Sequence, residues 1–396
     1  MITSAAQIRS FTGPALLSYG FRPFFLFGAL WAAFAVVLWL PMLSGHLDLP
    51  SSLSPIEWHV HELIYGYVPA IVAGFLLTAV PNWTGRLPVV GMRLAVLFGF
   101  WIAGRIAIFF SDWIGAGLAA AVDLSFLAML GLVITREIVA GKSLHNLKVL
   151  AGVALLLIGN TLFHLEAVVG IGDGHGTRLG IAAAILLIML IGGRIIPSFT
   201  RNWLARLGPG RLPVNFGRFD VMVMFASAAA LASWVIAAHP AATTGLALAA
   251  AVLNVTRLGR WAGERTAAEP LVLILHVAYA FVPVGFFLLG LASHQPGIVA
   301  PSGALHAWTT GAIGVMTLAV MTRASLGHTG RPLTATHSIL FVYIAAVAAA
   351  LFRIAAAFEV LREPMLYLAA IAWIFAFSGF VVIFARPMLQ RRGETS

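Results

Sequence analysis

The 396-residue sequence contains no cysteine, and only 10% of its residues are charged. Without cysteine there are no disulfides, no thiolate metal sites and no Cys-X-X-Cys-His motif for covalent attachment of haem. Any metal must therefore be bound through nitrogen or oxygen ligands. The charged fraction lies far below the roughly 25% of ordinary soluble domains, which excludes a water-soluble protein.

Long apolar segments follow one another along the whole chain. Hydrophobic residues make up 61% of the sequence, and apolar runs of about 20 residues are each long enough to cross a bilayer core. The runs between charged or Gly/Pro-rich breaks predict an all-α protein, a polytopic transmembrane helical bundle of about twelve helices. The predicted helices cover residues 24–43, 57–80, 92–110, 114–136, 147–170, 178–196, 219–238, 241–257, 269–292, 303–322, 335–356 and 365–386.

The distribution of positive charge predicts the orientation of these helices. Positive residues beside a membrane helix are retained in the cytoplasm. If the N-terminus is cytoplasmic, the 24 Lys and Arg residues all fall on the cytoplasmic side except Arg105, Arg178, Arg353 and Arg362. We therefore expect cytoplasmic N- and C-termini. Residues 1–22 contain no short apolar region followed by a small-residue cleavage site, so no cleaved signal peptide is expected. The net charge of +10 is scattered over short connections and forms no basic face, so no nucleic acid partner is expected.

A polar stretch near the middle of the chain separates the predicted helices into two halves. Residues 202–218 contain Pro209, Gly210 and Pro213, a composition typical of a linker. The sequence therefore predicts a single integral membrane domain, 1–396, in which two six-helix halves, 1–201 and 219–396, are joined by this cytoplasmic linker.

Four histidines are expected near the outer ends of their helices, where an ionisable side chain costs free energy and indicates a function. At a rise of about 1.5 Å per residue, His61 lies roughly 6 Å, His164 roughly 9 Å and His306 roughly 5 Å from the outer end. His59 lies nearer to the surface. Imidazoles that separate helices contribute at one depth are what a metal or haem site in a helical bundle requires.

Three more histidines form a second candidate layer near the inner ends. His276 lies roughly 10 Å and His337 roughly 3 Å from the inner end of its helix, and His328 is expected in the adjoining loop. This inner layer is the alternative location for a metal or haem centre.

The motif E-W-H-V-H-E, Glu57 to Glu62, places two of these histidines two residues apart. On a regular helix His59 and His61 point about 200° apart, so they are expected to face two different sites. Glu62 follows His59 by three residues on nearly the same face, where it could orient the imidazole as a second-shell group. The alternative is that the pair lies at the headgroup layer beside Trp58.

The predicted tenth helix carries small and basic residues that admit two interpretations. Gly311 and Gly314 would allow close approach of either a flat macrocycle or a neighbouring helix. Arg323, His328 and Arg331 cluster at the inner mouth, where they could bind an anion or haem propionates. The positive-inside rule explains the same arginines without any ligand.

Arg105 and Arg353 lie near the outer side of the predicted membrane region. They could bind haem propionates. Asp123, deep in its helix, needs a partner such as Arg105, and a structural ion pair is the alternative role for that arginine.

Several motifs resemble those of the NnrS proteins of bacterial nitric-oxide and denitrification regulons, over the full length of the chain. They are Ser18 to Phe25 (SYGFRPFF), Glu57 to Glu62 (EWHVHE), Gly74 to Arg86 (GFLLTAVPNWTGR), Leu275 to Tyr279 (LHVAY) and His306 to Arg331. The resemblance implies a protein of the bacterial inner membrane that contains haem b and copper and is linked to nitric oxide metabolism and nitrosative stress. The motifs include His59, His61, Glu62, His276, His306 and His328.

The residues and the resemblance together favour a haem-binding, and also copper-binding, membrane protein. We predict His61 and His306 as outer-layer ligands, with His59 and His164 available to a second metal. The expected partners are nitric oxide or a related small molecule, the lipid bilayer and an electron donor. The alternative function is a twelve-helix secondary transporter in which His and Asp side chains relay protons.

Overall fold

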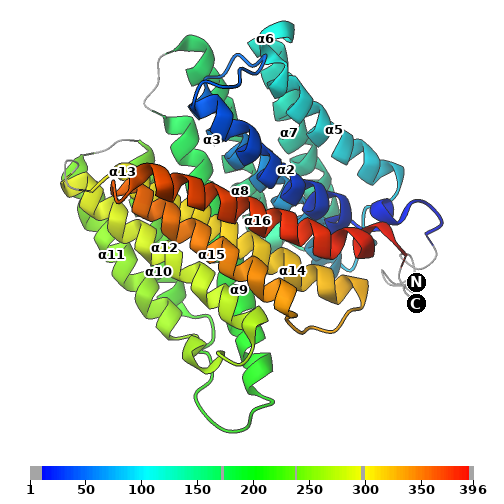
Figure 1. The fold of residues 1–396 in the computed structure, drawn as a ribbon. Helices are drawn as coiled ribbons and strands as arrows, with labels where there is room; N and C mark the ends of the chain where they lie inside the picture. Colours follow the sequence, from blue (N-terminus) through cyan, green and yellow to red (C-terminus); the bar gives the residue numbers. More distant parts are fainter. Residues whose placement is uncertain (1–10, 171–173, 237–238, 296–298, 392–396) are drawn as a thin grey trace. The chain divides into compact units, whose positions relative to one another are not determined.

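In a computed structural model, the described residues, 11–170, 174–236, 239–295 and 299–391, are organised almost entirely as helices (Figure 1). Twelve of the described helical segments are long and apolar enough to cross a membrane, as the sequence predicts. They are Phe21–Leu43 (α2), Pro55–Thr84 (α3, η2, α4), Met92–Phe109 (α5), Ala116–Ala140 (α7), Leu144–Val169 (η3, α8), His175–Leu204 (α9), Arg218–Val235 (α10), Pro240–Arg265 (α11, η4), Pro270–His294 (α12), Pro301–Thr329 (α13, η5, α14), His337–Ala357 (α15) and Arg362–Leu389 (α16).

Some spans extend beyond their predicted limits, and a local sequence signal explains one of these extensions. The second span begins two residues early because Ser54 and Glu57 form a capping box, in which Glu57 Oε2 accepts from Ser54 N at 2.9 Å, and Pro55 occupies the first turn. The tenth span continues to Thr329. His328 therefore lies in the last turn of α14 (Met316–Thr329), which corrects its predicted position in a loop.

Two spans contain a π-helical segment that directly follows a histidine. In the second span, η2 (Glu62–Tyr67) follows His61, the last residue of α3 (Pro55–His61). In the tenth span, η5 (Ala307–Val315) follows His306, the last residue of α13 (Pro301–His306). Because π-helical turns are rare and frequently occur at functional sites, both positions are candidates for a function.

The chain divides into two compact units, which are described separately. The first comprises the described residues of 1–180, 324–331 and 377–396, and the second those of 181–323 and 332–376. In the first, α2 packs against α4 (Val68–Thr84), and α7 packs against both α5 and α8 (Lys148–Val169). In the second, α11 (Pro240–Gly259) packs between α10 and α12, and η5 packs against α12 and α15. The orientation of the termini and the two six-helix halves remain predictions.

Glycines allow close packing of side chains against the spans of the second unit. A Cβ at Gly311 would lie 2.5 Å from the ring of Phe281, and one at Gly314 would lie 2.6 Å from that of Trp373. These contacts agree with the helix-packing interpretation of the two glycines. The indole of Trp308 lies in the same way against Gly285 of α12, where it donates from Nε1 to Val282 O at 3.1 Å.

Replacing Gly285 with alanine should destabilise the protein. The new Cβ would lie 2.2 Å from Trp308 Nε1, and relieving this overlap in a packed region costs about 1–3 kcal/mol. Gly245→Ala is the matched control, because a Cβ at that position in α11 meets no atom within 4 Å. Denaturant titration in detergent micelles would measure both free energies of unfolding, and equal values would contradict the prediction.

Candidate metal centre

A cluster of six polar side chains lies buried within the first unit. His61 ends α3, Glu62 begins η2, Arg105 lies on α5, Asp123 on α7, and Asn160 and His164 lie on α8. Each of the six is at most 7% exposed, although polar side chains are rarely buried so completely without a function or a full set of partners. This cluster of His61, Glu62, Arg105, Asp123, Asn160 and His164 is called the polar cluster below.

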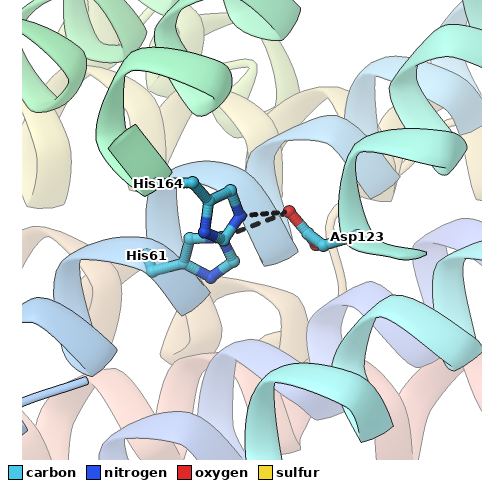
Figure 2. Close-up of side chains that lie close together, drawn as sticks. All are labelled: His61, Asp123 and His164. Carbon is cyan, nitrogen blue, oxygen red and sulfur yellow. Dashed lines mark hydrogen bonds and ion pairs between the residues drawn. The ribbon is translucent and has the colours of Figure 1, made fainter. Parts of the chain in front are cut away.

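Asp123 is at the centre of the polar cluster. Its Oδ2 lies 3.2 Å from His61 Nε2 and 3.2 Å from His164 Nε2, contacts that Figure 2 shows as dashed lines. The same oxygen accepts a hydrogen bond from Asn160 Nδ2 at 2.6 Å. Asn160 and His164 reach it together because residues four apart lie on one face of a helix.

Arg105 joins the two carboxylates of the polar cluster. Its Nη1 donates to Glu62 Oε1 at 2.6 Å, and its Nη2 donates to Asp123 Oδ1. The predicted ion pair between Asp123 and Arg105 is thus confirmed. Gly66 makes room for the guanidinium, since a Cβ there would lie 2.3 Å from Nη1. Two carboxylates and one guanidinium leave a net charge of −1 when both imidazoles are neutral.

The imidazole of His61 lies between two carboxylates. Its Nδ1 lies 2.9 Å from Glu62 Oε1, and its Nε2 lies 3.2 Å from Asp123 Oδ2. An ionised carboxylate only accepts hydrogen bonds, and a neutral imidazole has a single N–H. Both contacts are therefore favourable if His61 carries a second proton, if one of the two carboxyl groups is protonated, or if another cation lies between Nε2 and Asp123.

The atoms around Asp123 Oδ2 have the spacing of metal ligands. One ligand atom from each of His61, Asp123 and His164 lies within 4.8 Å of the other two. Metal bonds of about 2.0–2.1 Å in a tetrahedral site separate neighbouring ligands by about 3.3 Å. The two 3.2 Å separations between the imidazoles and Asp123 match this value. These three residues could therefore hold a metal ion.

Two aromatic side chains pack against His61 in the polar cluster. The ring centroid of His61 lies 5.3 Å from that of Phe163 and 5.8 Å from that of Tyr65. Tyr65 is itself held by a hydrogen bond from its hydroxyl to Gly176 O at 2.6 Å. The burial of the polar cluster, to which these rings contribute, strengthens the interactions among its charged groups.

The predicted outer-layer histidines have different neighbours in the structure. His61 meets His164, with ring centroids 4.9 Å apart. The ring of His59 stacks on Trp39 at 4.0 Å, so His59 and His61 have different neighbours. That they serve two different sites stays a prediction. His306 lies in the second unit, where its Nδ1 is 2.7 Å from Ser302 O. The pairing of His61 with His306 stays a prediction, as does the role of Glu62 toward His59.

The predicted inner-layer histidines have separate local contacts. His276 is buried, with its Nε2 2.8 Å from Thr200 Oγ1. The ring of His328 lies 5.2 Å from Tyr19 and 5.5 Å from Phe21. The remaining histidine, His337, is exposed at the start of α15. Their grouping into a metal or haem centre stays a prediction.

Two of the other predicted arginines, Arg323 and Arg353, lie in the second unit. The guanidinium of Arg323 lies 4.1 Å from the ring centroid of Phe199. Arg353 lies four residues before the end of α15 and is partly buried. Their binding of haem propionates stays a prediction.

Within the part of the chain that the structure describes, His61, Asp123 and His164 are the one group of three or more His, Asp or Glu side chains with metal-ligand spacing. Sequence reasoning selected both histidines by depth but gave Asp123 only a structural role, and it missed Asn160. The available signal was the four-residue spacing of Asn160 and His164 on one apolar helix.

Comparison with known protein families agrees with the motifs. The family model described as NnrS protein matches residues 15–392. No curated protein matches the chain.

Proposed function

Because this chain belongs to the NnrS family, we propose that it is a metalloprotein of the bacterial inner membrane that acts in nitric oxide metabolism or in protection from nitrosative stress. Its metal ion would be bound by His61, Asp123 and His164. The observation that carries the proposal is the position of His61, whose two ring nitrogens each face a carboxylate oxygen. A cation between Nε2 and Asp123 makes both contacts favourable.

Copper is the metal that we propose for this centre. Two imidazoles and a carboxylate suit copper, iron and zinc more than they suit magnesium or calcium. Bound copper would supply one-electron redox chemistry and an open position for a small ligand such as nitric oxide. Glu62 would hold His61 by its Nδ1–H, which fixes Nε2 as the ligand nitrogen. Arg105 would hold both carboxylates in place.

Haem b is the second cofactor that we propose. His306 is the axial ligand that we propose, since donation from its Nδ1–H to Ser302 O would leave Nε2 with the lone pair that iron requires. His276 and His328 remain further candidates, with Arg323 and Arg353 for the propionates. At His61 the carboxylate of Asp123 lies only 3.2 Å from Nε2, which favours a small ion there over a haem.

Elemental analysis and spectroscopy of the purified protein test the proposal. We expect copper and iron in amounts comparable to the protein, a Soret band, and changes in the absorption spectrum when nitric oxide is added. Protein purified from cells supplied with both metals that contains neither metal and shows no Soret band would contradict the proposal.

A secondary transporter is the alternative that the polar cluster also supports, because a buried carboxylate between two imidazoles can pass protons within a membrane. This function predicts a colourless protein and substrate-dependent proton flux in proteoliposomes. Flux that His164→Gln abolishes, in protein without metal, would favour the transporter.

A further inference from the structure

The fixed charges of the polar cluster restrict the charge of the ion that it can hold. Glu62 and Asp123 contribute one negative charge each, and Arg105, which pairs with both, contributes one positive charge. All three side chains are at most 5% exposed, so solvent does little to screen them. Imidazoles are neutral when they bind a metal. The charges of the protein groups around the ion therefore sum to −1.

Glu166, a further charged side chain near the polar cluster, does not change this sum. Glu166 lies two residues after His164, but its oxygens accept from the backbone N–H groups of His175 and Gly176 at 2.8 and 3.1 Å. Its side chain is also 19% exposed, beside a His175 that is 36% exposed. Glu166 therefore belongs to the partly solvated edge of this region, where water screens its charge.

We propose that the centre selects a monovalent cation that binds imidazole, of which Cu(I) is the biological example; this inference rests on the metal centre proposed above. A monovalent ion brings the buried sum to zero, whereas a divalent ion leaves an uncompensated charge of +1. Uncompensated buried charge is strongly unfavourable. The ligand atoms themselves accept Zn(II), Cu(II) and Cu(I), so the charge of the surroundings decides among them.

The comparison of Ag(I) with Zn(II) tests this inference directly. Ag(I) is a redox-inert monovalent ion, and competition with a chelator of known affinity gives the dissociation constant of each ion for the metal-stripped full-length protein. The informative quantity is the ratio of the two affinities, compared between the parent and its variants. Intrinsic differences between silver and zinc cancel in that comparison.

Arg105→Gln changes the fixed charge from −1 to −2, at which a divalent ion leaves no uncompensated charge. We expect the preference for Ag(I) over Zn(II) to fall by at least about 100-fold. In the parent the zinc complex has one uncompensated buried charge, whereas in the variant the silver complex has it. Arg105→Lys keeps the charge and is the matched control, for which we expect the ratio of the parent. Equal ratios in both variants and the parent would overturn the inference.

Glu62→Gln provides a second test in the opposite direction. It removes one negative charge with little change of shape, so both ions should bind more weakly and Zn(II) should lose more affinity than Ag(I). If Arg105→Gln does not fold, this variant decides, and an unchanged ratio overturns the inference. A parent protein that binds neither ion would contradict the metal centre itself. Binding of both ions with a charge-independent ratio would contradict only the monovalent selectivity.

Discussion

Purified His164→Gln and Asp123→Asn proteins should bind the metal ion of the polar cluster at least about 100-fold more weakly than the parent. Each substitution removes one of three ligands, and the loss of a residue that merely supports a ligand already costs about 10- to 100-fold in metal affinity. Asp123→Asn also removes the negative charge next to both imidazoles. Equilibrium dialysis followed by elemental analysis would measure the effect.

His46→Gln is the control for this experiment. His46 is exposed, and its Nδ1 lies 2.8 Å from the hydroxyl of Ser44, so its replacement should leave the metal content unchanged. Full metal occupancy in both His164→Gln and Asp123→Asn would show that the ion binds elsewhere.

The metal should also raise the unfolding temperature of the parent, because a ligand at 100 times its Kd stabilises the folded state by about 2.7 kcal/mol.

Replacing Arg257 with methionine should destabilise the second unit by about 3–5 kcal/mol. Arg257 is fully buried on α11, where its Nε donates to Asp220 Oδ1 at 2.9 Å and its Nη1 to Tyr279 Oη at 3.0 Å. Its removal leaves the buried carboxylate of Asp220 without its counter-charge, and the loss of one partner of a buried pair costs this amount. Denaturant titration in detergent micelles would measure the free energy of unfolding.

Two further variants test whether the unpaired charge of Asp220 or the lost packing around Arg257 causes this destabilisation. Arg211→Met breaks an exposed ion pair, in which Nη2 lies 2.6 Å from Glu264 Oε2, and should cost less than about 1 kcal/mol. The double variant Arg257→Met, Asp220→Asn removes both charges and should recover part of the lost stability. No recovery would mean that lost packing around Arg257, and not the unpaired charge, explains the destabilisation.

Hydropathy predicts the spans well because it depends on local composition. Every apolar run of sufficient length must satisfy its backbone hydrogen bonds within itself in a bilayer, and a helix does so. The twelve predicted spans are accordingly present. The extensions at both ends of the tenth span were not predicted, because helix ends depend on caps and on contacts that polar residues make outside the apolar run.

Depth along a helix placed His61 and His164 in one outer layer, but it assigned them to two different metals and did not predict that they meet each other. The position of a residue in the sequence gives its distance from the end of its helix. It does not give the rotation of each helix about its axis or the identity of its neighbours. Asn160 was missed for the same reason, since an amide in an apolar helix has no distinctive pattern until its partner, Asp123, is known.

The sequence by itself determined that this protein crosses a membrane with twelve helices and that no cysteine thiolate can bind a metal, because these properties follow from composition and segment length. Only the tertiary structure decided that His61, Asp123 and His164 converge from three spans and that Arg105 compensates part of their charge. The reason is physical: convergence depends on which helices pack together and on the faces they turn toward one another, and no local pattern contains that information.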